Sequence, residues 1–192
     1  MKKPNILFIL LDDMGWKDLA CTGSTFYETP NIDRLAREGM SFANAYASCP
    51  VCSPSRASFL TGKYPARLGL TDWIDMDGSS HPLRGRVIDA PYVKHIPEGE
   101  YTVAQALRDG GYAAWHVGKW HLGGEAYYPD REGFDVNIGG CSWGHPHQGY
   151  FAPYGIETLP EGPDGEYLTD RITDEAIRLI RSHDGKKPFF LN

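Results

Sequence analysis

Residues 5–11 read Asn5-Ile6-Leu7-Phe8-Ile9-Leu10-Leu11, an apolar run that stops at two aspartates. An apolar run without alternation is typical of a strand covered on both faces, as in a parallel sheet flanked by helices. We therefore expect a central strand of a parallel sheet at this position. The basic residues before it also resemble the start of a signal peptide, but no small-residue cleavage site follows the run.

Helix signals and apolar strands alternate along the rest of the chain. Capping residues and closing Gly predict helices at about residues 29–39, 53–62 and 102–111, the first two with Pro near their start. Apolar residues at helical spacing predict another helix at about residues 167–183. Short apolar runs predict strands at about residues 41–47, 112–117 and 189–191. Loops rich in Gly, Pro and aromatic residues fill residues 63–100 and 118–166. This order predicts an α/β fold with a mostly parallel sheet flanked by helices.

Charge and composition exclude several classes of protein. Lys and Arg number 19 against 25 Asp and Glu, and the net charge of −6 argues against a nucleic-acid or anionic-membrane surface. No stretch approaches the roughly 20 apolar residues that span a bilayer. On charge and hydropathy together, we expect neither nucleic acid nor a membrane as a partner. The four cysteines are too few and too unevenly spaced for a disulfide framework. They leave the cellular location open.

Asp12 and Asp13 follow the first predicted strand directly. Ligands of parallel sheets bind beyond the carboxyl ends of the strands, where these two carboxylates would start a Ca²⁺ or Mg²⁺ site. Calcium takes about 6 to 8 oxygen ligands, so further ligands must come from elsewhere. A solvated turn explains an isolated Asp-Asp pair equally simply.

Cys52 lies beside the start of the helix predicted from Ser53, and Arg56 follows within one helical turn. Amide groups, the helix dipole and a guanidinium would together form an anion pocket and favour a thiolate. Cys49 and Cys52 also form a C-x-x-C pattern, which leaves a redox pair, a zinc site and an unreactive buried pair as alternatives.

Lys119 and His121 follow the strand predicted at residues 112–117. On an extended chain the two side chains would point to the same side. Lys can hold an anionic oxygen, and His can donate a proton to a leaving group near neutral pH. A surface lysine beside a histidine of the core is the simpler alternative.

Aromatic and histidine side chains gather in the predicted loops at Trp73, Trp143, His145 and His147. Such side chains could stack on a sugar ring or an aryl group at the rim of a site. The histidine pair could also bind a metal ion or have no ligand at all.

Taken together, the sequence resembles the formylglycine-dependent sulfatases of the arylsulfatase type, within the alkaline-phosphatase-like superfamily. Four blocks carry the resemblance in family order: residues 5–13, residues 29–36, residues 52–62 with the pattern C-x-P-x-R and a trailing Thr-Gly, and residues 118–123 with Gly-Lys-Trp-His-Leu-Gly. The resemblance extends over essentially the whole chain, and it implies the alkaline-phosphatase-like fold.

The resemblance also implies a role for each matching residue. A maturation enzyme would oxidise Cys52 to formylglycine, whose hydrate supplies the nucleophile. Asp12 and Asp13 would be calcium ligands together with the modified Cys52. Arg56 would hold the nucleophile, and the side chains of Lys119 and His121 would bind the sulfate group or its bridging oxygen.

In the chemistry that the resemblance implies, attack at sulfur expels the alcohol of a sugar or aryl sulfate, and the second hydroxyl then eliminates sulfate. A phosphonate or phosphodiester hydrolase of the same superfamily is the alternative. Family members are typically more than twice as long, and an Asp-Asn pair of metal ligands lies in the part without a counterpart here. We therefore expect residues 1–192 to be an incomplete N-terminal part of a catalytic domain, and a catalytically inactive fragment is a further alternative.

Overall fold

The computed structural model describes residues 3–76, 86–88 and 90–192. The chain divides into a larger unit, Met1–Ile9 with Ser48–Asn192, and a smaller unit, Leu10–Ala47.

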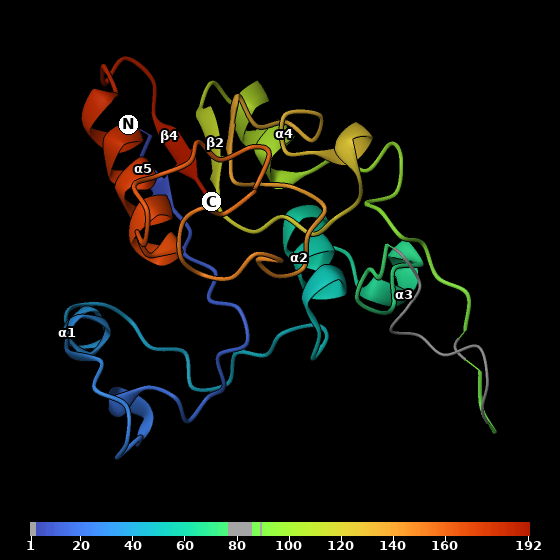
Figure 1. The fold of residues 1–192 in the computed structure, drawn as a ribbon, viewed down its shortest axis with the longest axis horizontal. Helices are drawn as coiled ribbons and strands as arrows, with labels where there is room; N and C mark the ends of the chain where they lie inside the picture. The colour runs from blue at the N-terminus through green and yellow to red at the C-terminus, as the bar shows by residue number, and fades with distance from the viewer. Residues whose placement is uncertain (1–2, 77–85, 89) are drawn as a thin grey trace. The chain divides into compact units, whose positions relative to one another are not determined.

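A parallel sheet forms the centre of the larger unit (Figure 1). Its described strands lie in the order β1 (Ile6–Leu7), β4 (Phe189–Leu191), β2 (Ala113–Val117) and β3 (Val136–Ile138). Every pairing is parallel, with Ile6 opposite Phe190 and Trp115 opposite both Leu191 and Val136. The predicted α/β fold with a mostly parallel sheet is therefore confirmed.

The first strand differs from its prediction. β1 is two residues long and lies at one edge of the described sheet, beside β4, so the prediction of a central strand is wrong for these residues. Phe8 continues the pairing through its N–H, which donates to the oxygen of Leu191 at 2.8 Å. Leu7 at the end of β1 and Ile9 beyond it are 53% and 67% exposed.

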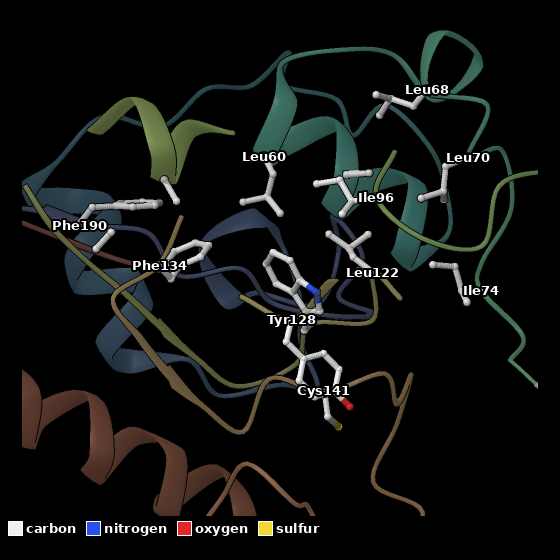
Figure 2. Close-up of a cluster of buried hydrophobic side chains, with 14 of the residues drawn as sticks. Leu60, Leu68, Leu70, Ile74, Ile96, Leu122, Tyr128, Phe134, Cys141 and Phe190 are labelled. Atoms are coloured by element: carbon white, nitrogen blue, oxygen red, sulfur yellow. The ribbon is translucent and has the colours of Figure 1, made fainter. Parts of the chain in front are cut away.

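Helices cover both faces of the sheet. On one face, α5 (Leu168–Ser182) packs against alternate strand residues, among them Trp115 and Phe189. On the other face, α2 (Cys52–Thr61) and α4 (Val103–Asp109) pack against Ala114 and Phe190. Figure 2 shows part of this second cluster, in which the side chains come from helices, strands and the loops between them. Long loop segments therefore contribute directly to the core.

The predicted helices of the larger unit are confirmed with small shifts at their ends. Gly62 closes α2 at φ +68°, a left-handed conformation that glycine adopts without strain. Thr102 begins α4 in a capping box with Gln105. The loop regions also contain a one-turn helix α3 (Pro65–Leu68), a 3₁₀ turn η2 (Glu125–Tyr127) and the strand β3. None of these three short elements was predicted.

The smaller unit contains a 3₁₀ turn η1 (Ala20–Thr22) and helix α1 (Pro30–Glu38). Thr29 precedes α1 as predicted, but its hydroxyl accepts from the N–H of Ala20 and donates to Asp33 instead of capping the helix. Residues 41–47 form turns and irregular backbone, so the predicted strand there is wrong. These residues have no strand beside them in their unit, and an isolated apolar run gains no ladder hydrogen bonds.

No helix within the described residues is both long enough and apolar enough to cross a membrane.

Candidate active site

The candidate site lies at the carboxyl edge of the sheet. Lys119 and His121 follow β2, and Cys141 lies in the loop that follows β3. Because β2 and β3 are adjacent and parallel, the two loops leave the sheet at the same edge. This is the edge at which open parallel sheets bind their ligands.

Cys52 is the first residue of α2, one position further into the helix than predicted. Its thiol is free and its side chain is half-buried. The Ser55 hydroxyl lies 2.7 Å from the backbone oxygens of both Cys49 and Val51, which holds the turn before the helix close to its first residues. The helix thus directs its N-terminal amide groups toward the side on which Cys52 lies.

Arg56 joins the helix of Cys52 to the loop of Lys119. Arg56 is 8% exposed, and its Nη1 donates to the backbone oxygen of Lys119 at 2.6 Å. The two residues are 63 positions apart in the sequence. This charge-assisted hydrogen bond fixes the loop against α2 and keeps a positive charge within the site.

His121 is buried, with 2% of its surface exposed. Its Nε2 lies 2.7 Å from the backbone oxygen of Ile74, and its N–H donates to the oxygen of Cys141 at 3.1 Å. The backbone at His121 is left-handed, with φ +61°, so the chain is not extended there. The prediction that Lys119 and His121 point to one side because the chain is extended is therefore wrong.

Ser53 and Ile74 link the start of α2 to His121, and the sequence analysis missed both. The Ser53 hydroxyl accepts a hydrogen bond from the backbone N–H of Ile74 at 3.0 Å, and the backbone oxygen of Ile74 accepts one from the ring of His121. These contacts bring the Cys52 block and the Lys119 block together through a third segment. They involve the backbone of Ile74, so no side-chain pattern in the sequence could have indicated them.

His116 lies beneath the site as a neutral side chain. Complete burial lowers the pKa of His116 to about 3. The hydrogen bond to Gly118 raises this pKa and the charge of Arg56 lowers it, but burial has the largest effect. Nε2 donates to the oxygen of Gly118 at 3.0 Å, and Nδ1 accepts from the amide of Asn192 at 2.9 Å. His116 therefore holds the backbone immediately before Lys119 without adding charge.

The predicted rim residues cluster in the loop after β3. The Trp143 and His147 rings stack with centroids 4.3 Å apart, and His145 lies 4.7 Å from His147. Gly144 packs on His121, since a Cβ atom at Gly144 would lie 2.6 Å from Cε1 of that ring. The structure thus places the loop of Trp143 beside His121.

Trp73, the fourth predicted rim residue, lies in another loop. Its backbone oxygen accepts from the Tyr92 hydroxyl at 2.7 Å. Trp73 directly precedes Ile74, so it lies next to the segment that contacts His121.

Asp12 and Asp13 belong to the smaller unit, where they form an exposed turn. Asp13 is left-handed at φ +54°, which Asp tolerates better than most residues. Their carboxylates are hard oxygen donors of the kind that Ca²⁺ takes, but two residues supply part of the required set. Within residues 3–76, 86–88 and 90–192, no group of three or more His, Cys, Asp or Glu could hold a metal ion. The calcium site stays a prediction.

The chain is similar to known proteins in sequence and in fold. A family model described as Sulfatase matches residues 4–192. The chain is 36% identical to N-acetylgalactosamine-6-sulfatase from Canis lupus familiaris and from Homo sapiens, over 98% of this chain and 38% of each relative. It therefore spans well under half the length of these curated relatives.

Solved structures share the fold. One, described as Ps i-CgsB in complex with k-i-k-neocarrahexaose, has a TM-score of 0.75 and 30% identity over 99% of this chain and 44% of that one. Another, BT4656 in complex with its substrate D-Glucosamine-2-N, 6-O-disulfate, has a TM-score of 0.70 and 29% identity over 99% of this chain and 33% of that one.

Proposed function

Because the chain belongs to the sulfatase family, we propose that it serves in the hydrolysis of a sulfuric ester, with Cys52 as the precursor of the nucleophile. The observation that carries the proposal is the hydrogen bond from Arg56 to the backbone oxygen of Lys119. It joins the two sequence blocks that hold the four proposed catalytic residues. The link from Ser53 through Ile74 to His121 gives independent support.

The proposed roles follow from charge and position. Formylglycine formed from Cys52 would supply, as its hydrate, the hydroxyl that attacks sulfur. Arg56 would hold this group through its positive charge, and Lys119 would bind the sulfate oxygens. His121 would exchange a proton with the bridging oxygen of the ester. Bound Ca²⁺ or Mg²⁺, held by Asp12, Asp13 and modified Cys52, would stabilise the negative charge that develops on the sulfate.

We propose a sulfated glycan or a small aryl sulfate as the substrate. The stacked Trp143 and His147 provide flat surfaces of the kind that pack on sugar or aryl rings. Two similar structures are described with k-i-k-neocarrahexaose and with D-Glucosamine-2-N, 6-O-disulfate, and these ligands belong to those proteins. Sulfated sugars are therefore the first compounds to test.

We also propose that residues 1–192 are the N-terminal part of a sulfatase catalytic domain, and that a formylglycine-generating enzyme is a partner. Support for an incomplete domain comes from the 38% share of the curated relatives that the chain covers. The exposed Leu7 of β1 and Ile9 beyond it also support it, because the apolar run to which they belong is typical of a covered strand.

Parallel assays on an aryl sulfate and an aryl phosphodiester test the proposed reaction. We expect protein that carries the aldehyde at Cys52 to favour the sulfate, and the Cys52→Ala variant to lose the activity. The ratio of the two rates decides the chemistry even when both rates are low. Faster turnover of the phosphodiester would contradict a sulfatase, and no turnover by converted protein would favour the inactive fragment.

A further inference from the structure

Ile74 is held at both ends of its backbone by the two parts of the candidate site. Its N–H donates to the hydroxyl of Ser53, which is fully buried, and its oxygen lies 2.7 Å from Nε2 of His121. Ser53 directly follows Cys52 in α2. One peptide segment therefore connects the nucleophile helix to the histidine.

The same segment is fixed on both sides of Ile74. The Tyr92 hydroxyl donates to the oxygen of Trp73, and Nζ of Lys94 donates to the oxygen of Asp75, each at 2.7 Å. Three consecutive carbonyl groups thus accept hydrogen bonds from side chains. The Ile74 side chain is 2% exposed and packs in the core that Figure 2 shows, which anchors the segment further.

The ring of His121 is held in one orientation. Gly144 packs so closely on the ring that a Cβ atom at Gly144 would overlap it. The backbone N–H of His121 donates to the backbone oxygen of Cys141. A carbonyl oxygen can only accept, so Nε2 must carry the hydrogen that bonds to Ile74. In the neutral ring the lone pair then lies on Nδ1.

We propose that the segment of residues 73–75 positions His121 for catalysis, with Ser53 as the positioning residue that couples it to the helix of Cys52. The segment fixes the neutral tautomer with hydrogen on Nε2, so a second proton that the ring takes up binds at Nδ1. Proton donation to the leaving group then requires the doubly protonated ring. The catalytic meaning of this assignment rests on the proposed sulfuric-ester hydrolysis, but the tautomer itself does not.

Nitrogen-15 NMR of the whole chain with labelled histidine tests the proposal without any turnover. The His121→Gln variant identifies the His121 signals. We expect the pattern of a ring protonated at Nε2 and bare at Nδ1 at neutral pH. In Ser53→Ala, the ratio of the Nε2-protonated tautomer to the Nδ1-protonated tautomer should fall about fivefold, which is the effect of losing one hydrogen bond.

Ser58→Ala is the matched control, because Ser58 lies in the same helix and its buried hydroxyl has no hydrogen-bond partner within the described residues. It should leave the ratio unchanged. Tyr92→Phe, which removes a bond to Trp73 without altering α2, should move the ratio in the same direction as Ser53→Ala and guards against misfolding of that variant.

A ring protonated at Nδ1, or equal ratios in Ser53→Ala and Ser58→Ala, would overturn the proposal. Either result would leave the proposed sulfuric-ester hydrolysis standing, because the tautomer is measured independently of activity. Conversely, a failed hydrolysis assay would not change the tautomer.

Discussion

Arg56 and His116 together determine the charge beneath the candidate site. Both are buried, and the Arg56 guanidinium donates to the backbone oxygen of Lys119, whereas burial lowers the pKa of His116 to about 3, so that side chain is neutral. A second buried cation beside Arg56 would be costly. The neutral histidine instead orders the backbone at Gly118. Of these two buried side chains, Arg56 alone therefore carries a positive charge that can attract an anion.

The lowered pKa of His116 predicts an acid-sensitive fold. The unfolded chain binds a proton on this histidine below about pH 6.5, while the folded chain stays neutral down to about pH 3. The stability that His116 contributes is therefore complete above pH 6.5 and falls by about 1.4 kcal/mol per pH unit below it. Urea unfolding between pH 7 and pH 4 measures this slope.

His116→Gln should flatten the acid side of the stability curve, since glutamine does not titrate. The exposed His145 offers a control, and His145→Gln should keep the slope of the unchanged protein. An identical slope in His116→Gln and the unchanged protein would show that other groups cause the acid sensitivity.

The elements show which parts of the fold follow from local sequence. The helices at residues 52–61, 103–109 and 168–182 were predictable because their signals are local: a closing Gly for each of the first two, the Thr102 cap for the second, and apolar spacing for the third. β3 was missed because three residues in a Gly-rich loop become a strand only by pairing with β2. The strand predicted at residues 41–47 does not form for the opposite reason, because an apolar run without a neighbouring strand makes no ladder hydrogen bonds.

The cap of α4 provides a test of this local reasoning. The Thr102 hydroxyl accepts from the N–H of Gln105 at 3.1 Å and donates to the oxygen of Glu132 at 2.7 Å, and the side chain is fully buried. Thr102→Ala should lower the free energy of unfolding by about 1 to 2 kcal/mol. Thr102→Ser keeps the hydroxyl and should recover most of the loss in urea unfolding. Equal losses in the two variants would mean that the methyl group, not the cap, carries the stability.

Over the whole molecule, the proposed site draws on residues from distant parts of the chain. Cys52, Arg56, Lys119 and His121 could be predicted because they lie in short blocks that resemble one family. The backbone link through Ile74 could not, because it forms only when two loops meet the start of α2. Asp12 and Asp13 lie in the smaller unit, and their role as metal ligands stays a prediction.

Calcium binding by the chain tests the metal prediction. Two carboxylates supply fewer oxygens than Ca²⁺ requires, so we expect weak binding, with Kd of about 10⁻³ M or above. Asp12→Asn should weaken it further, whereas Asp164→Asn, at an exposed position elsewhere, should not. Calorimetric titration measures the affinity. Tight binding at one ion per chain would contradict an incomplete ligand set.

The most direct test of the account is mass spectrometry of the peptide that contains Cys52, from protein produced together with a formylglycine-generating enzyme. We predict that Cys52 carries the aldehyde, while Cys49 and Cys141 in the same sample keep their thiols. Arg56→Ala should prevent the conversion, because it breaks the C-x-P-x-R pattern. An unmodified thiol at Cys52, with an active maturation enzyme confirmed on another sulfatase, would contradict the account.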